Sequence, residues 1–514
     1  MIKKKYYIPN TDFLSDRNWL ESFLKLDISL FEKELRTRGE GFWQNLGEEK
    51  ALRIFHSAAT RVPAYKDFLK KRKINHKNIK TIDDFKKIPL TDKKNYISIY
   101  PLAKRCWDGN LSNSKLMAVS SGTSGEPTFW PRSDYQEYEQ NIIHELTYKY
   151  SFQVDKYKTL IIIGFPMGIY VSGMATTLPT FASLSKKIKA TFVTPGNNKL
   201  EVLKIVKNLW GDFEQFVFIG HPFFLKDVIE TGKTDGLKWS SKKIKMMFCS
   251  EGFTEAWRSY VLKEAGANNK FEHAINTYGS SEILLTATET PLSIFIRKEM
   301  EKNEIFRKKI INSEVTPNIF QFNPLLRFIE SIDNELLFTS AGQVPLVRFN
   351  IHDAGGIIPF NDVEKELGTK LNKLKNKSNI NLWELPFVTL FGRSDHTVIF
   401  YAANIYPEHV RMALEHEQFF GKITGKFAMQ KTCKENLEQC LEINIELKPG
   451  IDPDASFADV VRDVVSKRLK EINKEYADTS SHTEKDLRPV IKLWPHGHEK
   501  YFKPGLKPRF IVRE

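Results

Sequence analysis

The sequence predicts an α/β protein with a large N-terminal domain, helices on its sheets and a small β subdomain, followed by a small α+β domain. Three observations carry this prediction. The chain has 514 residues, more than one hydrophobic core usually supports. After residue 110, short β-rich runs alternate with helical ones, which is typical of a largely parallel sheet covered by helices. A shorter unit with its own strands and helices follows "LFGRSD", so we place the domain boundary between 1–394 and 395–514.

The spacing of apolar residues predicts the individual elements. Residues 17–46 and 48–73 repeat apolar side chains every three or four positions, so the first hundred residues should be helical. Buried strands are expected at 159–165, 189–195, 213–220 and 243–250. A hairpin-like β segment is expected over 334–340 and 345–360, and an exposed excursion over 361–380. The C-terminal unit should contain strands at 396–402 and 441–449 and helices at 407–417 and 457–473.

Composition narrows the class of protein. The net charge is +14, but the lysines are scattered among acidic residues, which favours a solvated basic surface and no nucleic-acid partner. The four cysteines show no paired spacing, and no secretory signal is visible, so the cytoplasm is expected. Residues 159–185 carry no charge but contain several glycines and prolines. We therefore expect a buried strand followed by a small-residue helix there, and no membrane span.

The chemistry is predicted to centre on "SSGTSGEPT", residues 120–128. Short side chains and glycines after a strand let backbone N–H groups turn toward an anion, and the hydroxyls add donors. The stretch lacks the lysine of a Walker phosphate loop and does not match G-x-G-x-x-G. Alone, such a Ser/Gly stretch is a flexible linker more often than a nucleotide site, so its meaning depends on the other motifs of the chain.

Those motifs resemble the adenylate-forming superfamily of acyl-CoA synthetases, adenylation domains and luciferases. "SSGTSGEPT" is similar to its phosphate-loop signature, "NTYGSSE" to its Y-G-x-x-E, and "PLVRFNIHDAG" to its P-x-x-R-Y-x-x-x-D. "FGRSDHTVIFYAANIYP" resembles its crossing between domains, and "GLKPRFIV" its terminal lysine segment. "AATRVPAYKDFLKK…IPLTDK" further resembles the lead-in of phenylacetate–CoA ligase-like proteins. The resemblance covers nearly the whole chain.

The resemblance implies a role for each matched position. ATP would be bound by Ser121, Gly122, Thr123, Ser124, Gly125, Tyr278, Gly279, Ser280, Asp353 and Arg393. Within this set the loop wraps the β- and γ-phosphates, Tyr278 stacks near the adenine, and Asp353, backed by Arg393, binds the ribose hydroxyls. Glu282 would hold Mg²⁺, and Lys507 would be the catalytic lysine, with Lys500 and Lys503 as rival candidates. Asp395 would be the hinge of a mobile C-terminal lid.

The acyl pocket can only be guessed from the resemblance, which points to Phe165, Tyr170 and His221. Aromatic residues and a histidine in strand-rich stretches are more often core residues, and each of the three can be read that way.

The function implied is ATP- and Mg²⁺-dependent conversion of a carboxylic acid, aryl or another small acid, to its acyl-adenylate. The acyl group then passes to a thiol, first of all CoA. Transfer to a carrier-protein pantetheine or to an amine is an alternative, and so is a non-catalytic nucleotide-binding member. The chain departs from the family pattern at Ala402, where a glycine beside the pantetheine path is expected, and at His396. The identity of the acid, the acceptor, the oligomeric state and the pathway stay open.

Overall fold

The computed structural model describes residues 26–512, apart from gaps at 115, 121–127, 169–170, 185–189, 268–270, 272, 372–373, 375–381, 394–397, 402, 434–438, 482–485 and 503–509. One sheet of eleven strands runs through the N-terminal part of the chain, in the order β10-β11-β12-β13-β9-β8-β7-β6-β5-β3-β4. Its β3 to β7 half is parallel and its β8 to β13 half antiparallel. The predicted fold class is confirmed, and the two halves are continuous through the β7–β8 and β8–β9 pairs.

The parallel half is built as the apolar runs predict. Its strands are β3 (Thr159–Gly164), β4 (Ala190–Val193), β5 (Gln215–Gly220), β6 (Lys243–Cys249) and β7 (Ala274–Ser280). They are connected by α8 (Val171–Leu184), α9 (Lys199–Asn208), α10 (Pro222–Thr234) and α11 (Glu255–Glu264). Successive side chains of β3 face two different cores: Leu160 and Ile162 pack with α9 to α11, and Ile161 and Ile163 with the core on the other face. Strands β3, β5 and most of β6 are therefore buried on both faces, which explains their continuous apolar runs, whereas the edge strand β4 is only partly buried.

The antiparallel half follows in the chain. Its strands are β8 (Leu284–Thr288), β9 (Asn318–Gln321), β10 (Phe328–Ile332), β11 (Glu335–Ser340), β12 (Leu346–Ile358) and β13 (Phe387–Arg393). Three helices lie between them: α12 (Pro291–Lys302), α13 (Glu304–Ile311) and α14 (Phe360–Leu367). The expected hairpin is confirmed as β11 against β12. The expected exposed excursion after residue 360 begins instead with helix α14, because Phe360, Val363 and Leu367 pack into a core with α12.

The first hundred residues are helical, as predicted, over the part that the structure describes. They form α2 (Ile28–Thr37), α3 (Glu40–Arg61), α4 (Pro63–Lys71), α5 (Ile82–Phe85) and α6 (Leu102–Arg105), with a short π-helical turn η2 (Lys93–Ile97). A hairpin of β1 (Leu116–Val119) and β2 (Phe129–Arg132) follows, and then α7 (Asp134–Leu146) with the turn η4 (Thr147–Ser151). Side chains of these helices pack with α7 and the antiparallel half in the largest core of the molecule.

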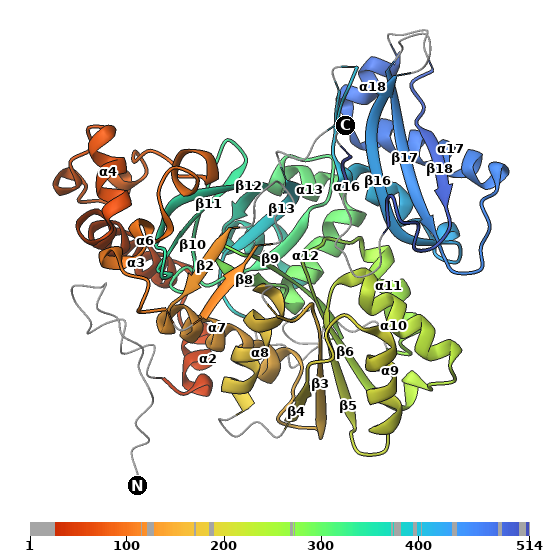
Figure 1. The fold of residues 1–514 in the computed structure, drawn as a ribbon, viewed down its shortest axis with the longest axis horizontal. Coiled ribbons are helices and arrows are strands. Elements are labelled where there is room, and N and C mark those ends of the chain that lie inside the picture. Colours follow the sequence, from red (N-terminus) through yellow and green to blue (C-terminus); the bar gives the residue numbers. More distant parts are fainter. Residues whose placement is uncertain are drawn as a thin grey trace.

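Residues from Val398 onward pack around a core of their own. They form β14 (Val398–Phe400), β15 (Ala403–Ile405), α16 (Pro407–Leu414), β16 (Ile423–Cys433), β17 (Gln439–Leu447), α17 (Ala455–Ile472), α18 (Lys474–Ser481) and β18 (Val490–Trp494). Figure 1 shows this part at the upper right as a separate body that lies beside α10 and α11. The domain boundary at residue 394 lies outside the described residues and stays a prediction.

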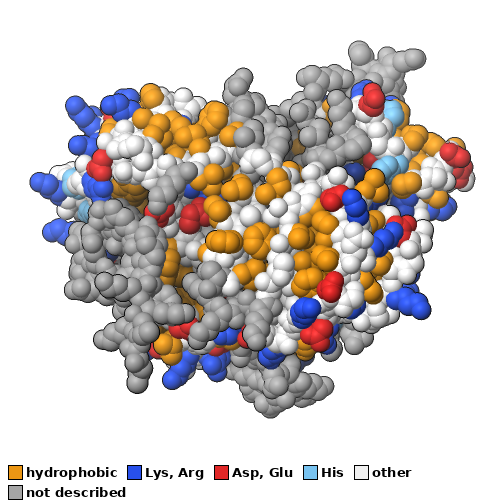
Figure 2. Space-filling model, turned by 60° about the horizontal axis from the view of Figure 1, so that its bottom comes forward, with side chains coloured by type: hydrophobic (Ala, Val, Ile, Leu, Met, Phe, Trp, Pro, Cys, Tyr) orange, Lys and Arg blue, Asp and Glu red, His pale blue; other side chains and the backbone are white. Residues whose placement is uncertain are grey.

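Two surface properties bear on function. In the face seen in Figure 2, lysine and arginine side chains lie mostly toward the edges with acidic side chains among them, and do not gather into one stripe. Among the described residues, no helix combines the length and the apolar character needed to cross a membrane. Residues 159–164 form a fully buried strand, as their composition predicted.

Candidate active site

The carboxyl ends of the parallel strands bring several predicted residues to one edge of the sheet. Strands β3, β5, β6 and β7 pair in parallel register, so the segments that follow them lie at the same end. Phe165 follows β3, His221 follows β5, and Glu282 follows β7. This edge is where ligands of open α/β sheets usually bind.

Two predicted nucleotide-binding residues that are 75 positions apart in the chain touch each other. The Tyr278 hydroxyl of β7 donates a hydrogen bond to Oδ2 of Asp353 in β12, at 2.6 Å. Both side chains are buried, and one neighbour of the tyrosine ring is Phe320, whose ring centroid lies 5.7 Å away in a stacked arrangement. Asp353 pairs in the β12–β13 register with Arg393. The sheet therefore joins the two motifs, and Asp353 has one carboxylate oxygen engaged with Tyr278.

The position after Tyr278, still within β7, admits only glycine. A Cβ atom at Gly279 would lie 2.4 Å from the backbone oxygen of Leu284 on the neighbouring strand. Two residues later the chain turns, and the Glu282 N–H donates to the Ser280 hydroxyl at 3.3 Å. This close backbone approach places the Glu282 carboxylate directly beyond the end of β7.

Glu282 has a cationic neighbour that the sequence reasoning did not assign. The ammonium of Lys93 lies 3.0 Å from Oε1 of Glu282. Lys93 directly follows Thr91 and Asp92, and Thr91 is tied to β12 because its Oγ1 donates to Val347 O at 2.9 Å and its backbone exchanges hydrogen bonds with that strand. In the sequence Lys93 ends "IPLTDK", a stretch that resembles the lead-in of the family branch and does not by itself mark a site residue.

A pocket opens beside Glu282. It measures about 220 Å³, including the part open to solvent, and is lined by Trp130, Pro131, Arg132, Gln136, Ser281, Glu282, Leu284, Gly342, Gln343 and Val344. The end of the β1–β2 hairpin, the start of α7 and the segment before β12 thus meet at the predicted metal ligand. Among the described residues, no group of three or more His, Cys, Asp or Glu side chains is placed to hold a metal ion. A single carboxylate suits a Mg²⁺ that arrives on substrate phosphates, since Mg²⁺ keeps few protein ligands.

The phosphate-loop residues Ser121, Gly122, Thr123, Ser124 and Gly125 lie outside the described residues, as do Tyr170, Asp395, Lys503 and Lys507. The described ends of the loop segment are held together: Ser120 N–H donates to Thr128 O at 3.0 Å, and Thr128 N–H donates to Ser120 Oγ at 3.0 Å. The β1–β2 pairing thus brings both ends of this segment to the side of the molecule where Trp130 and Arg132 line the Glu282 pocket.

The guessed acyl-pocket residues have less specific surroundings. Phe165 is 4% exposed and belongs to the main core. His221 precedes α10, and its ring lies 5.5 Å from that of Phe223. Neither residue lines the Glu282 pocket, so their role as acyl-pocket residues stays a prediction.

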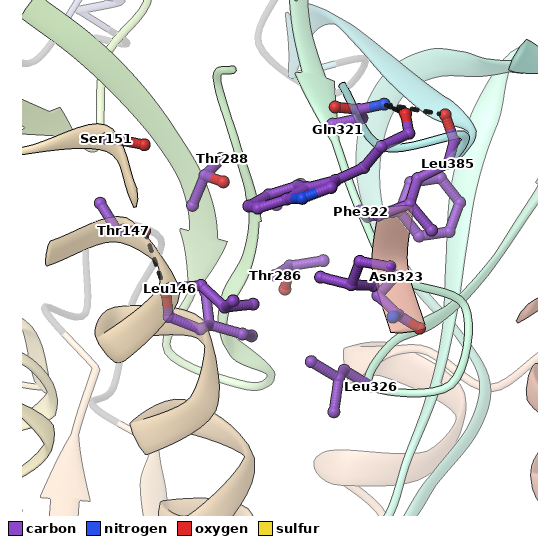
Figure 3. Close-up of a pocket in the computed structure, with 14 residues that line it drawn as sticks. Leu146, Thr147, Ser151, Thr286, Thr288, Gln321, Phe322, Asn323, Leu326 and Leu385 are labelled. Carbon is purple, nitrogen blue, oxygen red and sulfur yellow. Dashed lines mark hydrogen bonds between the residues drawn. The ribbon is translucent and has the colours of Figure 1, made fainter. Parts of the chain in front are cut away.

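A second pocket lies farther along α7. It measures about 500 Å³, including open space, and is lined by Leu35, Ile143, Leu146, Thr147, Ser151, Thr286, Ala287, Thr288, Gln321, Phe322, Asn323, Leu326, Trp383 and Leu385. Figure 3 shows side chains from η4, β8 and the segment after β9 around a common, mainly apolar space. Gln140 of α7 lies between the two pockets in sequence, and its amide exchanges two hydrogen bonds with the backbone of Leu285, at 2.9 and 3.1 Å.

The small domain contacts the large one close to the candidate site. Arg411 of α16 forms an ion pair with Glu251, which follows β6, at 2.6 Å. Oε2 of Glu415 accepts a hydrogen bond from Thr254 N–H at 2.6 Å. Glu408 packs against the end of β13, where a Cβ at Gly392 would lie 2.3 Å from its carboxyl carbon. Burial raises the pKa of both Glu408 and Glu415 to about 7.

Comparison with known proteins identifies the fold. No protein-family model matches the chain, and no curated protein matches it in sequence. Solved structures of 2-hydroxyisobutyryl-CoA ligase do match. In the postadenylation state with R3-HIB-AMP, the match has a TM-score of 0.63 and 13% identity and covers 99% of this chain and 94% of that one. In the thioesterification state with 2-HIB-AMP and CoA, the values are 0.51, 14%, 98% and 94%. The chain thus has the fold of an adenylate-forming ligase over its whole length.

Proposed function

We propose that this chain, which has the fold of adenylate-forming ligases, activates a carboxylic acid with ATP. The carboxylate oxygen attacks the α-phosphorus, acyl-AMP forms and pyrophosphate leaves. A thiol then attacks the acyl carbon and AMP leaves, with CoA as the first acceptor to consider. The observation that carries the proposal is the contact between Tyr278 and Asp353, because it joins two motifs recognised independently in the sequence, four residues before Glu282.

The nucleotide would lie across the edge of the sheet beyond β7. In this proposal the Asp353 carboxylate, with Arg393 beside it in the register, accepts hydrogen bonds from the ribose hydroxyls. Two acceptor oxygens on one side chain suit a vicinal diol. Ser121 to Gly125 wrap the β- and γ-phosphates through backbone N–H groups and hydroxyls, which is why the segment needs no lysine of its own.

Glu282 is the residue that would hold Mg²⁺. The ion, when bound with ATP, neutralises charge on the phosphate oxygens. Lys93 forms an ion pair with the Glu282 carboxylate at 3.0 Å, and carboxylate oxygens are the ligands that a hard cation prefers.

Lys507 would neutralise charge that develops on the reacting carboxylate and the α-phosphate. A long cationic side chain on the small domain can do this only when that domain is closed over the large one, which also excludes water from the acyl-adenylate. Asp395 would be the hinge. A carrier-protein pantetheine or an amine in place of CoA leaves these first-step roles unchanged, and a nucleotide-binding protein without catalysis would keep only the ATP contacts.

The test is formation of hydroxamate and pyrophosphate from a panel of aryl, fatty and amino acids with ATP, Mg²⁺ and hydroxylamine. Hydroxylamine traps any acyl-adenylate, so the assay does not depend on the natural acceptor. Acid-dependent formation of both products supports adenylation and reveals the class of acid. Folded protein that binds ATP but forms neither product with any acid on the panel contradicts it and favours the non-catalytic alternative. Repeating the reaction with CoA, with a phosphopantetheinylated carrier or with amines then distinguishes the acceptors.

A further inference from the structure

Arg132 is a buried cation at the pocket that holds Glu282. It is the last residue of β2, just after the segment expected to bind phosphates, and only 2% of its side chain is exposed. It lines the same pocket as Glu282, Gln136 and Gln343. A charged side chain so far from water requires a partner that offsets its lost hydration.

The partners of Arg132 among the described residues are few for a guanidinium. Its Nε lies 2.5 Å from Oε1 of Glu137 in the first turn of α7. None of its three nitrogens makes a hydrogen bond of good geometry to a described acceptor. A guanidinium carries five N–H donors, which match the oxygens of carboxylates and phosphates. Donors left unpaired in a buried site destabilise the protein until an acceptor reaches them.

The surroundings of Arg132 contain a second buried arginine with donors that are unpaired among the described residues. Glu139 of α7 is shared by two cations, Lys50 of α3 and Arg327 before β10. Nε and Nη2 of Arg327 also lack a hydrogen-bond partner among the described residues. Lys50, Arg132 and Arg327 thus lie among three carboxylates, Glu137, Glu139 and Glu282. Burial lowers the pKa of Lys50, and the charge of Arg327 lowers it further while Glu139 raises it. The unpaired guanidinium donors of Arg132 and Arg327 near the N-terminal half of α7 can therefore bind the oxygens of an additional anion.

We propose that Arg132 binds the β- and γ-phosphate oxygens of ATP and the pyrophosphate that leaves, and so supplies the cation that the loop before it lacks. This inference rests on the proposed function. Thr128 stands where the common signature has lysine. Alternate residues of an extended segment share one side, so positions 128 and 132 lie on the same side of the hairpin. Arg132 therefore brings a positive charge to the side of Thr128, two pleat repeats farther along the strand. Glu137 holds the guanidinium when no phosphate is bound.

Two substitutions separate a phosphate-binding role from a structural one. Arg132→Gln and Glu137→Gln both break the same ion pair, so a merely structural pair predicts the same loss in both. Phosphate binding by Arg132 predicts opposite results. In ATP–pyrophosphate exchange, Arg132→Gln should raise KM for pyrophosphate and ATP about tenfold or more, because charge-assisted hydrogen bonds are lost. Glu137→Gln should leave both KM values unchanged or lower them, since Arg132 loses its competing carboxylate. The KM for the acid should not change in either variant.

Arg132→Lys and an unrelated buried arginine complete the design. Arg132→Lys keeps the charge and should recover part of the affinity. Arg348→Lys alters a comparably buried arginine that pairs with Glu330 at 3.2 Å and lines neither pocket, so it should not change the KM for pyrophosphate. Melting temperatures of all variants show whether each one folds. Equal KM increases in Arg132→Gln and Glu137→Gln, or no increase in Arg132→Gln, would overturn the inference.

Direct binding of pyrophosphate separates this inference from the proposed function. Titration calorimetry with Mg²⁺-pyrophosphate needs neither the acid nor turnover. If the wild-type protein forms hydroxamate but Arg132→Gln binds pyrophosphate as tightly as wild type, the function stands and the inference is wrong. If no acid is activated, yet pyrophosphate binds and only Arg132→Gln loses it, the phosphate site stands and the proposed catalysis is wrong.

Discussion

Asp353 shows how a single side chain can have two partners in the proposed site. One of its oxygens accepts a hydrogen bond from the Tyr278 hydroxyl at 2.6 Å, and the carboxylate is also proposed to accept hydrogen bonds from the ribose. We predict that Asp353→Ala weakens ATP binding by about tenfold or more, because hydrogen bonds to a charged acceptor are lost. Calorimetric titration with ATP, without acid, measures this.

Tyr278→Phe is the matched control for this prediction. It removes the hydroxyl that bonds to Asp353 and keeps the carboxylate and the aromatic ring. We expect its ATP affinity to stay within about threefold of wild type, with stability lowered by roughly 1 kcal/mol for the lost hydrogen bond. If Tyr278→Phe weakens ATP as much as Asp353→Ala does, the carboxylate acts through the tyrosine and the ribose assignment is wrong.

The catalytic lysine is the second prediction at this scale. Lys507→Ala should abolish hydroxamate formation and leave ATP affinity unchanged, because Lys507 is proposed to act on charge that develops only during adenylation. Lys500→Ala is the control, since Lys500 is exposed and its ammonium lies 5.0 Å from the Tyr501 ring centroid. Loss of activity in Lys500→Ala alone would transfer the role to that residue.

At the scale of single residues, the sequence predicted the motifs better than their neighbours. Tyr278, Glu282 and Asp353 can be proposed from the sequence because each lies in a motif with its own spacing. Lys93 and Arg132 carry no such signal. Lys93 pairs with Glu282, and Arg132 shares a pocket with Glu282 and Gln343, so both are recognised only once the fold brings these distant segments together. Charged residues at surface-like spacing give no signal of burial until the fold is known.

At the scale of elements, α7 is the helix that organises the candidate site. Its first turn carries Glu137 and Gln136, its middle carries Gln140, and its last turns carry Ile143 and Leu146. These positions place the Glu282 pocket and the second pocket along one helix, about 10 Å apart by the helical rise between Gln136 and Ile143. Gln140 is fully buried and satisfies the backbone of Leu285 where the β7–β8 pairing is irregular.

Gln140 lies on α7 between Gln136, which lines the Glu282 pocket, and Ile143, which lines the second pocket, and its removal tests whether the two pockets can be connected. We predict that Gln140→Ala lowers the free energy of unfolding by roughly 2 kcal/mol, because Leu285 loses two hydrogen-bond partners. It should also let longer apolar acids be activated, since the second pocket behind it is mainly apolar. Thermal unfolding and the hydroxamate assay over a series of chain lengths measure the two effects.

Gln140→Met is the matched control, because methionine fills a similar volume without the two hydrogen bonds. We expect the same loss of stability and no gain of longer acids. If both variants show the same range of acids, the second pocket is not connected to the acid site, and the separation is only a matter of packing.

The elements themselves were largely predictable, and their assembly was not. The four runs predicted as strands correspond to β3 to β6. Burial on both faces accounts for the apolar runs of β3, β5 and β6, and the edge strand β4 is only partly buried. The sequence did not indicate that β8 and β9 join the parallel and antiparallel halves into one sheet. The β8–β9 contact is a single residue pair, Thr288 with Gln321, too short to leave a pattern in either segment.

At the scale of the whole molecule, the contact between the two parts of the chain contains more carboxylates than cations. The Arg411 guanidinium lies 2.6 Å from the Glu251 carboxylate and 4.0 Å from that of Glu408. The Glu415 carboxylate accepts a hydrogen bond from Thr254 N–H. The nearby charges of Glu251 and Asp353 add to burial in raising the pKa of Glu408, while Arg411 lowers it. Protonation of Glu408 and Glu415 therefore favours the contact of α16 with the large domain.

The contact should consequently weaken as the pH rises. In water the Glu408 and Glu415 carboxyls have pKa values near 4.5, and burial at the contact raises both to about 7. Docking therefore takes up protons, and its stabilisation is complete below the lower pKa and lost as the pH rises through about 7. From pH 6 to pH 8 the docking equilibrium should fall roughly tenfold for each carboxyl. Spin labels at exposed positions 200 on α9 and 460 on α17 report the distance between the two parts.

The double variant Glu408→Gln, Glu415→Gln shows whether these two groups carry the effect. Amides do not titrate, so the label distance in this variant should be the same at pH 6 and pH 8, whereas in the wild-type protein the population at longer distance should grow at pH 8. Arg411 would keep Glu251 as its partner in the variant, so the docked population should remain. A wild-type distance that does not change with pH would contradict the prediction, and an equal change in both proteins would assign it to other groups. Because the proposed lid has to leave this contact between the two half-reactions, such a shift would also change which half-reaction is slower as the pH rises.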